Sequence, residues 1–319
     1  MIRVILILLL FSGCNIRKGS SQKEHSSVKI TSLIQARRGF VTTLTKKNRI
    51  GVAAVKPPDE SGLTLVTYPT ALGPMAAYVS KPPSKGRHPA IIWVFGTFYN
   101  SITSVAWEPV AQDRDMSARA FRDAGVITMY PSTRGGNNNP GYVEALYGEV
   151  DDILHARAYL AKQPFVDPRR IYVGGHSTGG SMVLLLAAAE SGWRGVISIG
   201  PAAYTKNYGA KALPYDVTKS RENTLRSPAR WLHLIRSPTF VFEGTKEPTN
   251  VDVLDVLKRT SSNPQIHYFK VFGKDHFSCI TPVTRAMASL IIRDTDLTRA
   301  FTVNVKRLQT RLGKENGKR

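Results

Sequence analysis

One serine in this chain stands in a setting suited to a nucleophile. Gly175-His176-Ser177-Thr178-Gly179 follows the β-branched and aromatic segment 170–174 and precedes strong helix formers at 181–190. A strand that turns straight into a helix at Gly-x-Ser-x-Gly holds its serine above the sheet, at the positive end of the helix dipole. The turn is so tight that the residues two before and two after the serine must lack bulk. We therefore expect Ser177 to form a covalent intermediate.

An unaided serine hydroxyl is a poor nucleophile, so a base must take its proton. His276 is the candidate, because of the seven histidines it alone follows a predicted strand (266–272) in a Gly-Lys-Asp-His loop downstream of Ser177. The same imidazole would later hand the proton to the leaving group.

Alternating strands and helices would position these two residues. Segments 63–68 and 75–79 predict an antiparallel hairpin. Buried parallel strands are predicted near 90–95, 126–130, 170–174, 195–199, 238–243 and 266–272, with helices between them. The predicted fold class is α/β, with a mostly parallel central sheet and helices on both faces.

From about Leu63 to Ile292 the chain resembles the α/β-hydrolase superfamily, and within it the prolyl oligopeptidase catalytic domain and the dienelactone hydrolase-like branch. The matching segments are Pro131-Ser132-Thr133-Arg134-Gly135-Gly136, Gly148-Glu149-Val150-Asp151-Asp152, Val166-Asp167-Pro168-Arg169-Arg170-Ile171, 175–180 and 273–277. Dienelactone hydrolase proper uses a cysteine where this chain has Ser177. Prolyl oligopeptidases carry a β-propeller, and the stretch before residue 90 is too short for several four-stranded blades.

The resemblance implies the order serine, acid, histidine, with the acid shortly after the strand at 238–244. Glu247, three residues past the glycine that ends this strand, is the predicted acid. It would fix the tautomer of His276 and stabilise the imidazolium. Other carboxylates near enough in sequence to compete are Glu243, Asp252, Asp255 and Asp275.

The resemblance also implies an oxyanion hole and a cap. One backbone N–H would come from Thr178 and the other from Thr97 (or Phe98), in the loop after strand 90–95. Many relatives have His-Gly-Gly there, whereas this chain has Phe95-Gly96-Thr97. The segment at about 201–236 falls where this fold places caps and is the predicted source of specificity. Its aromatic residues are Tyr204, Tyr208, Tyr215 and Trp231.

A helix predicted over about 144–162 carries two neighbouring acids, Asp151 and Asp152. We expect these to cap the helix or to pair with Arg134 and Arg157, rather than to take part in catalysis.

The N-terminus predicts a destination. Met1-Ile2-Arg3 is a short basic segment, and the apolar run from Val4 to Phe11 is too short to span a bilayer. Ser12-Gly13-Cys14 then resembles a bacterial lipoprotein processing site, which implies cleavage before Cys14 and lipid on its thiol. An ordinary signal peptide or an uncleaved anchor is the alternative. Asn15, in place of an aspartate, favours an outer-membrane address within the cell envelope of a Gram-negative cell.

Composition limits the partners and cofactors. The net charge is +21, and basic residues crowd both ends of the chain. On a lipid-anchored protein such ends favour anionic lipid or an anionic envelope polymer, and solubilising charge is an equal alternative. No recognition motif accompanies the charge, so we expect no nucleic-acid partner. The CxxC and HExxH spacings of metal sites are absent, so we predict no metal and no cofactor.

The two cysteines are Cys14 and Cys279. Acylation of Cys14 would leave no disulfide partner within the mature chain. Cys279, just past His276, is predicted to pack in the helix that follows.

These patterns together predict a secreted, lipid-anchored serine hydrolase that forms an acyl-enzyme on Ser177. Its substrates would be small esters or short-peptide amides, as in a carboxylesterase or a prolyl oligopeptidase-like peptidase. A catalytically silent scaffold that binds an envelope ligand, and an envelope-binding module driven by the basic ends, are the alternatives. The predicted parts are a signal peptide (1–13), a lipidated tether and N-terminal extension (14–60), the catalytic domain (61–300) and a basic C-terminal tail (301–319).

Overall fold

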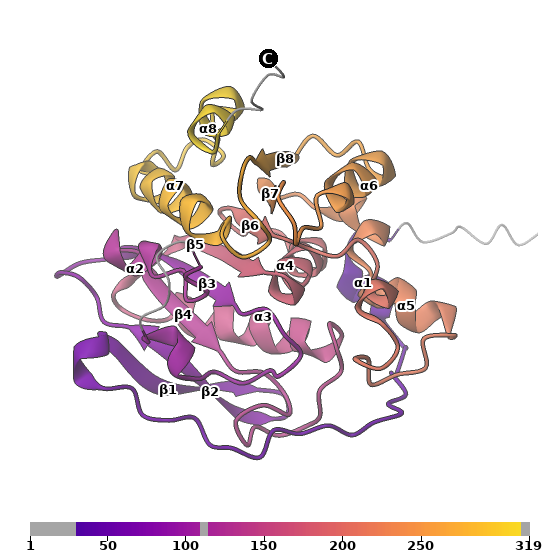
Figure 1. The fold of residues 1–319 in the computed structure, drawn as a ribbon. Helices are drawn as coiled ribbons and strands as arrows, with labels where there is room; N and C mark the ends of the chain where they lie inside the picture. The colour runs from indigo at the N-terminus through magenta and orange to yellow at the C-terminus, as the bar shows by residue number, and fades with distance from the viewer. Residues whose placement is uncertain (1–29, 109–113, 314–319) are drawn as a thin grey trace, which may run out of the picture. The chain divides into compact units, whose positions relative to one another are not determined.

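The computed structural model describes residues 30–108 and 114–313, and the described residues from Thr31 onward belong to one compact unit (Figure 1). Within the described part, eight strands form one sheet in the order β1-β2-β4-β3-β5-β6-β7-β8. The strands are β1 (Leu63–Thr70), β2 (Gly73–Ser80), β3 (His88–Val94), β4 (Ile127–Pro131), β5 (Val166–His176), β6 (Val196–Ile199), β7 (Thr239–Gly244) and β8 (Ile266–Val271). Strand β2 pairs antiparallel with β1 and β4, and all other pairs are parallel. This topology confirms the predicted fold class and the hairpin that opens the sheet.

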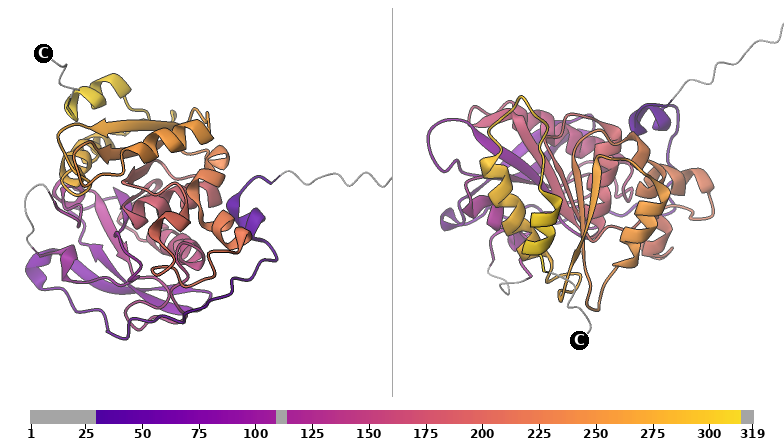
Figure 2. Two further views of the ribbon diagram at one scale, coloured as in Figure 1. Left: turned by 45° about the vertical axis from the view of Figure 1, so that its right-hand side comes forward. Right: turned by 90° about the horizontal axis from the view of Figure 1, so that it is seen from above.

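Helices cover both faces of the sheet, as the right-hand view of Figure 2 shows for α6 on one side and α7 on the other. Alternate strand residues point to opposite faces, so Ile92 packs in one core and Ile91 and Trp93 in the other. The first core includes residues of α1 (Leu33–Arg37), α3 (Gly148–Ala161), α4 (Thr178–Ala189), α5 (Ser220–Arg226) and α6 (Asp252–Thr260). The second includes residues of α2 (Ala120–Asp123), α7 (Ile280–Arg293) and α8 (Val305–Arg311).

The described part of the N-terminal extension packs along the domain. We call residues 31–50 the strap. Its Leu44 forms an isolated antiparallel bridge with Tyr215 of the cap segment 201–236, and Thr45 N–H donates to Pro214 O at 2.7 Å. Further along, Ile50 N–H donates to Gly135 O at 2.6 Å. The strap therefore connects the cap to the loop after β4.

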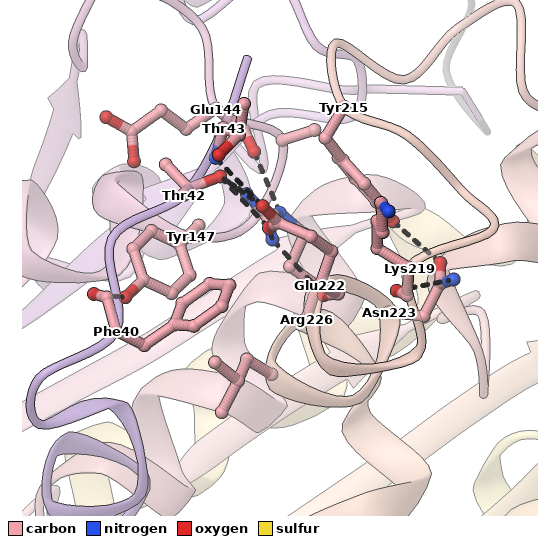
Figure 3. A network of polar contacts seen from close by, with 12 residues as sticks. Phe40, Thr42, Thr43, Glu144, Tyr147, Tyr215, Lys219, Glu222, Asn223 and Arg226 are labelled. Atoms are coloured by element: carbon pink, nitrogen blue, oxygen red, sulfur yellow. Dashed lines mark hydrogen bonds and ion pairs between the residues drawn. The ribbon is translucent and has the colours of Figure 1, made fainter. Parts of the chain in front are cut away.

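Figure 3 shows the polar network that joins the strap to the cap. Arg226, fully buried on α5, pairs with Glu222 and donates to Thr42 Oγ1 of the strap. Glu222 in turn accepts a 2.9 Å hydrogen bond from Thr43 N–H. The Arg226 guanidinium also lies 4.2 Å from the ring centroid of Tyr215. The third nitrogen of the guanidinium, Nε, donates to Glu144 O at 3.0 Å, so the buried charge is fully paired, as burial of charge requires.

The C-terminal segment is part of the fold as far as residue 313. Leu308 and Leu312 are buried in the core formed with α7, while Lys306, Arg307 and Arg311 remain exposed. No helix among the described residues is long and apolar enough to cross a membrane. Cys14 and the predicted signal peptide lie outside the described residues.

Candidate active site

The serine lies in the strained turn that the sequence predicts. Ser177 joins β5 to α4 with φ 57° and ψ −118°, a conformation that costs a non-glycine residue about 1–3 kcal/mol. A Cβ on Gly175 would lie 2.6 Å from backbone atoms of Gly179, and one on Gly179 would lie 2.1 Å from Val94 O. Side chains at these two glycines would therefore break the turn. The tightness expected from Gly-x-Ser-x-Gly is confirmed.

His276 lies in the loop after β8 and is oriented by a buried carboxylate. Its Nδ1 lies 2.9 Å from Oε2 of Glu243, the second-last residue of β7. Glu243 is fully buried, and its other oxygen accepts the N–H of Gly244 at 2.8 Å. A Cβ on Gly200, directly after β6, would lie 2.4 Å from His276 Cε1. The carboxyl ends of β6, β7 and β8 lie on the same side of the sheet. The Glu243–His276 pair is therefore held at these strand ends, where Ser177 also follows its strand.

The prediction that Glu247 orients the histidine is wrong. Glu247 is exposed, and its Oε2 accepts only the N–H of Thr249 among the hydrogen bonds of the described residues. The loop carrying His276 packs directly on the end of β7, since a Cβ on Gly244 would lie 2.3 Å from Lys274 O. The histidine therefore meets the acid inside the strand, not the one beyond it.

The other competing acids have different surroundings. Asp275 Oδ1 accepts the N–H groups of Phe277 and Ser278, and these bonds cap the turn after His276. Asp252 and Asp255 are exposed on α6. One sequence signal distinguishes Glu243 from all of them, because it is the only charged residue in the apolar run Thr239–Gly244. A charge in a buried strand requires a partner.

The loop after β3 meets the residue after the nucleophile. Thr97 has a φ of 134°, and its N–H donates to Thr178 Oγ1 at 2.6 Å, while that hydroxyl donates to Thr97 O at 3.0 Å. The Thr97 amide predicted to bind the oxyanion is thus engaged by a side-chain hydroxyl in this structure. Thr178 is the first residue of α4, where backbone N–H groups have no acceptor within the helix.

A buried glutamate fixes this loop to the rest of the domain. Asn100 Nδ2 donates to Glu149 Oε1 at 2.9 Å and to Arg134 O at 2.8 Å. Glu149 also accepts the N–H groups of Glu144 and Ala145. Glu149 thus holds the turn that precedes α3, and α3 begins at Gly148, four residues later than predicted.

The predicted role of Asp152 is confirmed in part. Arg134 donates Nε and Nη2 to the two oxygens of Asp152 at 2.9 and 2.8 Å, and Nη1 to Glu144 at 2.7 Å. Burial raises the pKa of Asp152, although the bonds from Arg134 oppose this. Arg157 pairs with Glu190 instead, so the prediction that it pairs with Asp151 or Asp152 is wrong.

The cap segment 201–236 contacts both the loop after β3 and the helix that follows Ser177. Tyr208 packs edge-on against Phe98 of the β3 loop, with ring centroids 5.1 Å apart. Its hydroxyl hydrogen-bonds with Ser181 of α4 at 2.7 Å, and Ser181 Oγ also accepts the N–H of Ala202. The start of the cap segment is thus tied to the first turn of the helix that follows the nucleophile.

The assembled groups are those of nucleophilic acyl transfer. A serine in a strained turn, an imidazole whose Nδ1 faces a carboxylate, and the first amides of a helix can attack a carbonyl and stabilise the resulting oxyanion. Within residues 30–108 and 114–313, no group of three or more His, Cys, Asp or Glu side chains is placed to hold a metal ion.

Residues 113–245 match the model of the prolyl oligopeptidase family. The match includes Ser177 and Glu243 and ends before His276. The prediction of an α/β-hydrolase related to this family is confirmed.

Solved structures share the fold at low sequence identity. The chain is similar to an acylaminoacyl peptidase of Pyrococcus horikoshii (13% identity, TM-score 0.60, 77% of this chain and 43% of that one). It is also similar to a puromycin-hydrolyzing peptidase of Mycobacterium tuberculosis (16%, 0.59, 73% and 39%). An esterase of Pyrobaculum calidifontis matches over 72% of this chain and 85% of its own (17% identity, TM-score 0.52). The chain spans less than half the length of the two peptidases.

Proposed function

We propose that this protein is a serine hydrolase that cleaves small esters or short-peptide amides through an acyl-enzyme on Ser177. The observation that carries the proposal is the Glu243–His276 pair, held at the sheet edge where Ser177 stands in a strained turn. In the part that matches the family, both Ser177 and Glu243 are present.

The mechanism follows from which atoms are engaged. Because His276 Nδ1 faces a carboxylate, that nitrogen carries the proton and Nε2 is left as the base. His276 takes the Ser177 proton as Oγ attacks the carbonyl, and Glu243 stabilises the imidazolium. The imidazolium then protonates the leaving group, and water releases the acyl group by the reverse sequence.

The oxyanion would be held first by the Thr178 N–H at the start of α4. The Thr97 N–H can join it once the substrate oxygen replaces Thr178 Oγ1 as its acceptor, because the present acceptor is a side-chain hydroxyl that a rotation about χ1 moves away. Phe98 supplies the next amide along the same loop.

The substrate class follows from similarity. The neighbours in structure are named as peptidases and an esterase. We infer that the site takes small esters and short peptides, with the cap segment 201–236 selecting among them.

Two measurements test this function. A fluorophosphonate probe should label wild-type protein stoichiometrically, and peptide mapping should place the label on Ser177. A panel of p-nitrophenyl esters and aminoacyl-nitroanilides should then show turnover. A folded protein that takes up no label would be a silent scaffold, and the hydrolase proposal would fail.

We also propose that the protein is a lipoprotein of the cell envelope, anchored through Cys14. The apolar run before Cys14, the small residues Ser12 and Gly13, and the polar segment after it support this. The exposed basic residues of the strap and of α8 would add attraction to anionic lipid or envelope polymer.

A further inference from the structure

A second histidine lies directly behind the proposed base. His176 is the last residue of β5, immediately before Ser177, and only 1% of it is exposed. Its Nε2 lies 2.9 Å from the backbone carbonyl oxygen of His276. The two imidazole rings are tilted against each other with centroids 4.5 Å apart. His176 thus joins the strand that carries the nucleophile to the loop that carries the base.

The contact fixes which nitrogen of His176 carries a proton. A carbonyl oxygen can only accept, so His176 Nε2 must be the N–H donor. Burial, reinforced by the neighbouring His276, lowers the pKa of His176 to about 3, so the ring is neutral at physiological pH. In a neutral ring with a proton on Nε2, Nδ1 is unprotonated. That atom is buried and has no hydrogen-bond partner among the described residues.

The imidazole and the backbone of His276 are held by different partners. Its imidazole is oriented by Glu243, and its backbone is held by His176 through the carbonyl and by Pro248, whose oxygen accepts the His276 N–H at 2.8 Å. Among the described residues, the other donor to this carbonyl is the Sγ of Cys279, at 3.4 Å, and a thiol is a weak donor. Without His176, the carbonyl would lose its one strong donor.

The loop after β3 is the third segment that packs near the His176 ring. A Cβ on Gly96 would lie 2.9 Å from Ser177 Cβ and 3.4 Å from His176 Nδ1. The His176 ring thus fills the space between the loop after β3, the turn at Ser177 and the His276 loop. A ring locked on three sides is a rigid reference for the base.

We propose that His176 is a positioning residue. Its Nε2–H bond to the His276 carbonyl holds the His276 imidazole in the position from which it can take the proton of Ser177. This inference rests on the proposed hydrolase function. His176 itself transfers no proton in the reaction. A displacement of the base by about 1 Å is enough to cost about 100-fold in rate.

The test compares His176→Leu, which removes the donor, with His176→Gln, whose amide can still reach the carbonyl. The measurements are kcat and KM on the best p-nitrophenyl ester of the wild-type protein, together with the rate of fluorophosphonate labelling. We expect His176→Leu to lower kcat by about 10- to 100-fold with little change in KM, and His176→Gln to recover most of it. Equal losses in the two variants, or a folded His176→Leu with wild-type kcat, would overturn the proposal.

His88→Leu is the matched control. His88 Nε2 also lies near a backbone carbonyl, that of Ser84 at 3.0 Å. His88, however, is the first residue of β3, at the amino end of the strand and away from the carboxyl ends that carry the site. Its loss should leave kcat unchanged. If wild-type protein itself is neither labelled nor active, the hydrolase function fails. If wild type is active and His176→Leu is equally fast, only the positioning role fails.

Nitrogen NMR of the histidine-labelled full chain decides the matter if the variants do not fold. The proposal requires a His176 ring that stays neutral from pH 5 to 8, with a slowly exchanging proton on Nε2. A His176 that titrates in this range, or that carries its proton on Nδ1, would overturn it.

Discussion

Two glutamates near the site differ in burial, and burial decides how strongly each can act on His276. Glu243 and Glu247 are separated by one short turn, yet Glu243 is fully buried against His276 and Glu247 is exposed. A buried carboxylate acts strongly on a neighbouring imidazole because little water screens it, whereas an exposed carboxylate is screened.

The two glutamates therefore make a matched pair of variants. Glu243→Gln should lower kcat by a factor on the order of 10² to 10⁴, because the amide cannot stabilise the imidazolium. Glu247→Gln should stay close to wild type. Ester turnover at saturating substrate measures both, and the assignment fails if their order is reversed.

Ser177 and His276 should fail together. Ser177→Ala and His276→Ala should each remove about four or more orders of magnitude of turnover, and the double variant should be hardly worse than either, because each residue is useless without the other. Kinetics of all three proteins on one ester are the measurement. Losses that multiply would mean that the two residues act independently.

Cys279 should be chemically silent in the folded protein. It is fully buried at the start of α7, and burial raises the pKa of its thiol, so little thiolate is present to react. A Cys14→Ser protein treated with a thiol reagent at pH 8 should react only after unfolding in denaturant. Rapid reaction of the native protein would show that the α7 end opens.

At the scale of elements, the strap and the cap form one unit. Arg37, near the end of α1, donates to the carbonyls of Leu146 and Leu225, while Arg226 donates to the carbonyl of Glu144. The strap, the turn before α3 and the cap helix α5 are thus connected through two buried guanidinium groups. The turn before α3 also holds the loop after β3, through Glu149.

Removing Arg226 should therefore destabilise the whole domain. Arg226→Met leaves Glu222 buried without its partner, and we expect a loss of about 3–5 kcal/mol in the free energy of unfolding. Urea denaturation gives this value, and adding Glu222→Gln should recover part of it. Arg221→Met, on the exposed side of the same helix above Phe40, is the control and should change little. Equal effects at the two arginines would contradict a buried network.

At the scale of the whole molecule, the net charge and the N-terminal sequence both favour the proposed attachment to a membrane. The net charge is +21, and basic residues of both the strap and α8 are exposed. One acyl chain binds a bilayer only marginally, whereas several chains on one cysteine, supported by basic residues, anchor a protein stably.

The lipid itself is the decisive measurement for Cys14. Wild-type protein expressed in a bacterial host should incorporate labelled palmitate and partition into detergent, and Cys14→Ala should lose the label. Detergent partition alone is a weaker readout, because an uncleaved apolar run could keep the variant in the membrane. An unlabelled wild-type protein with a different mature N-terminus would leave a plain secreted hydrolase.

Local pattern was sufficient to predict much of this protein. The strands, the turn at Ser177 and the loop with His276 are encoded by short runs of apolar, β-branched and glycine residues, whose conformations depend mainly on neighbours in sequence. The fold class follows because alternating buried strands and helices have few ways to pack.

Contacts between distant segments decided the rest. The acid is Glu243 because the loop at 273–276 packs on Gly244, and nothing near Glu247 in sequence reports that approach. The Thr97 amide is occupied because Thr178, 81 positions away, places its hydroxyl beside it. The roles of His176 and of the strap likewise depend on partners about 100 to 180 positions away. Burial and pairing of polar groups are properties of the packed chain, so only the tertiary structure could assign them.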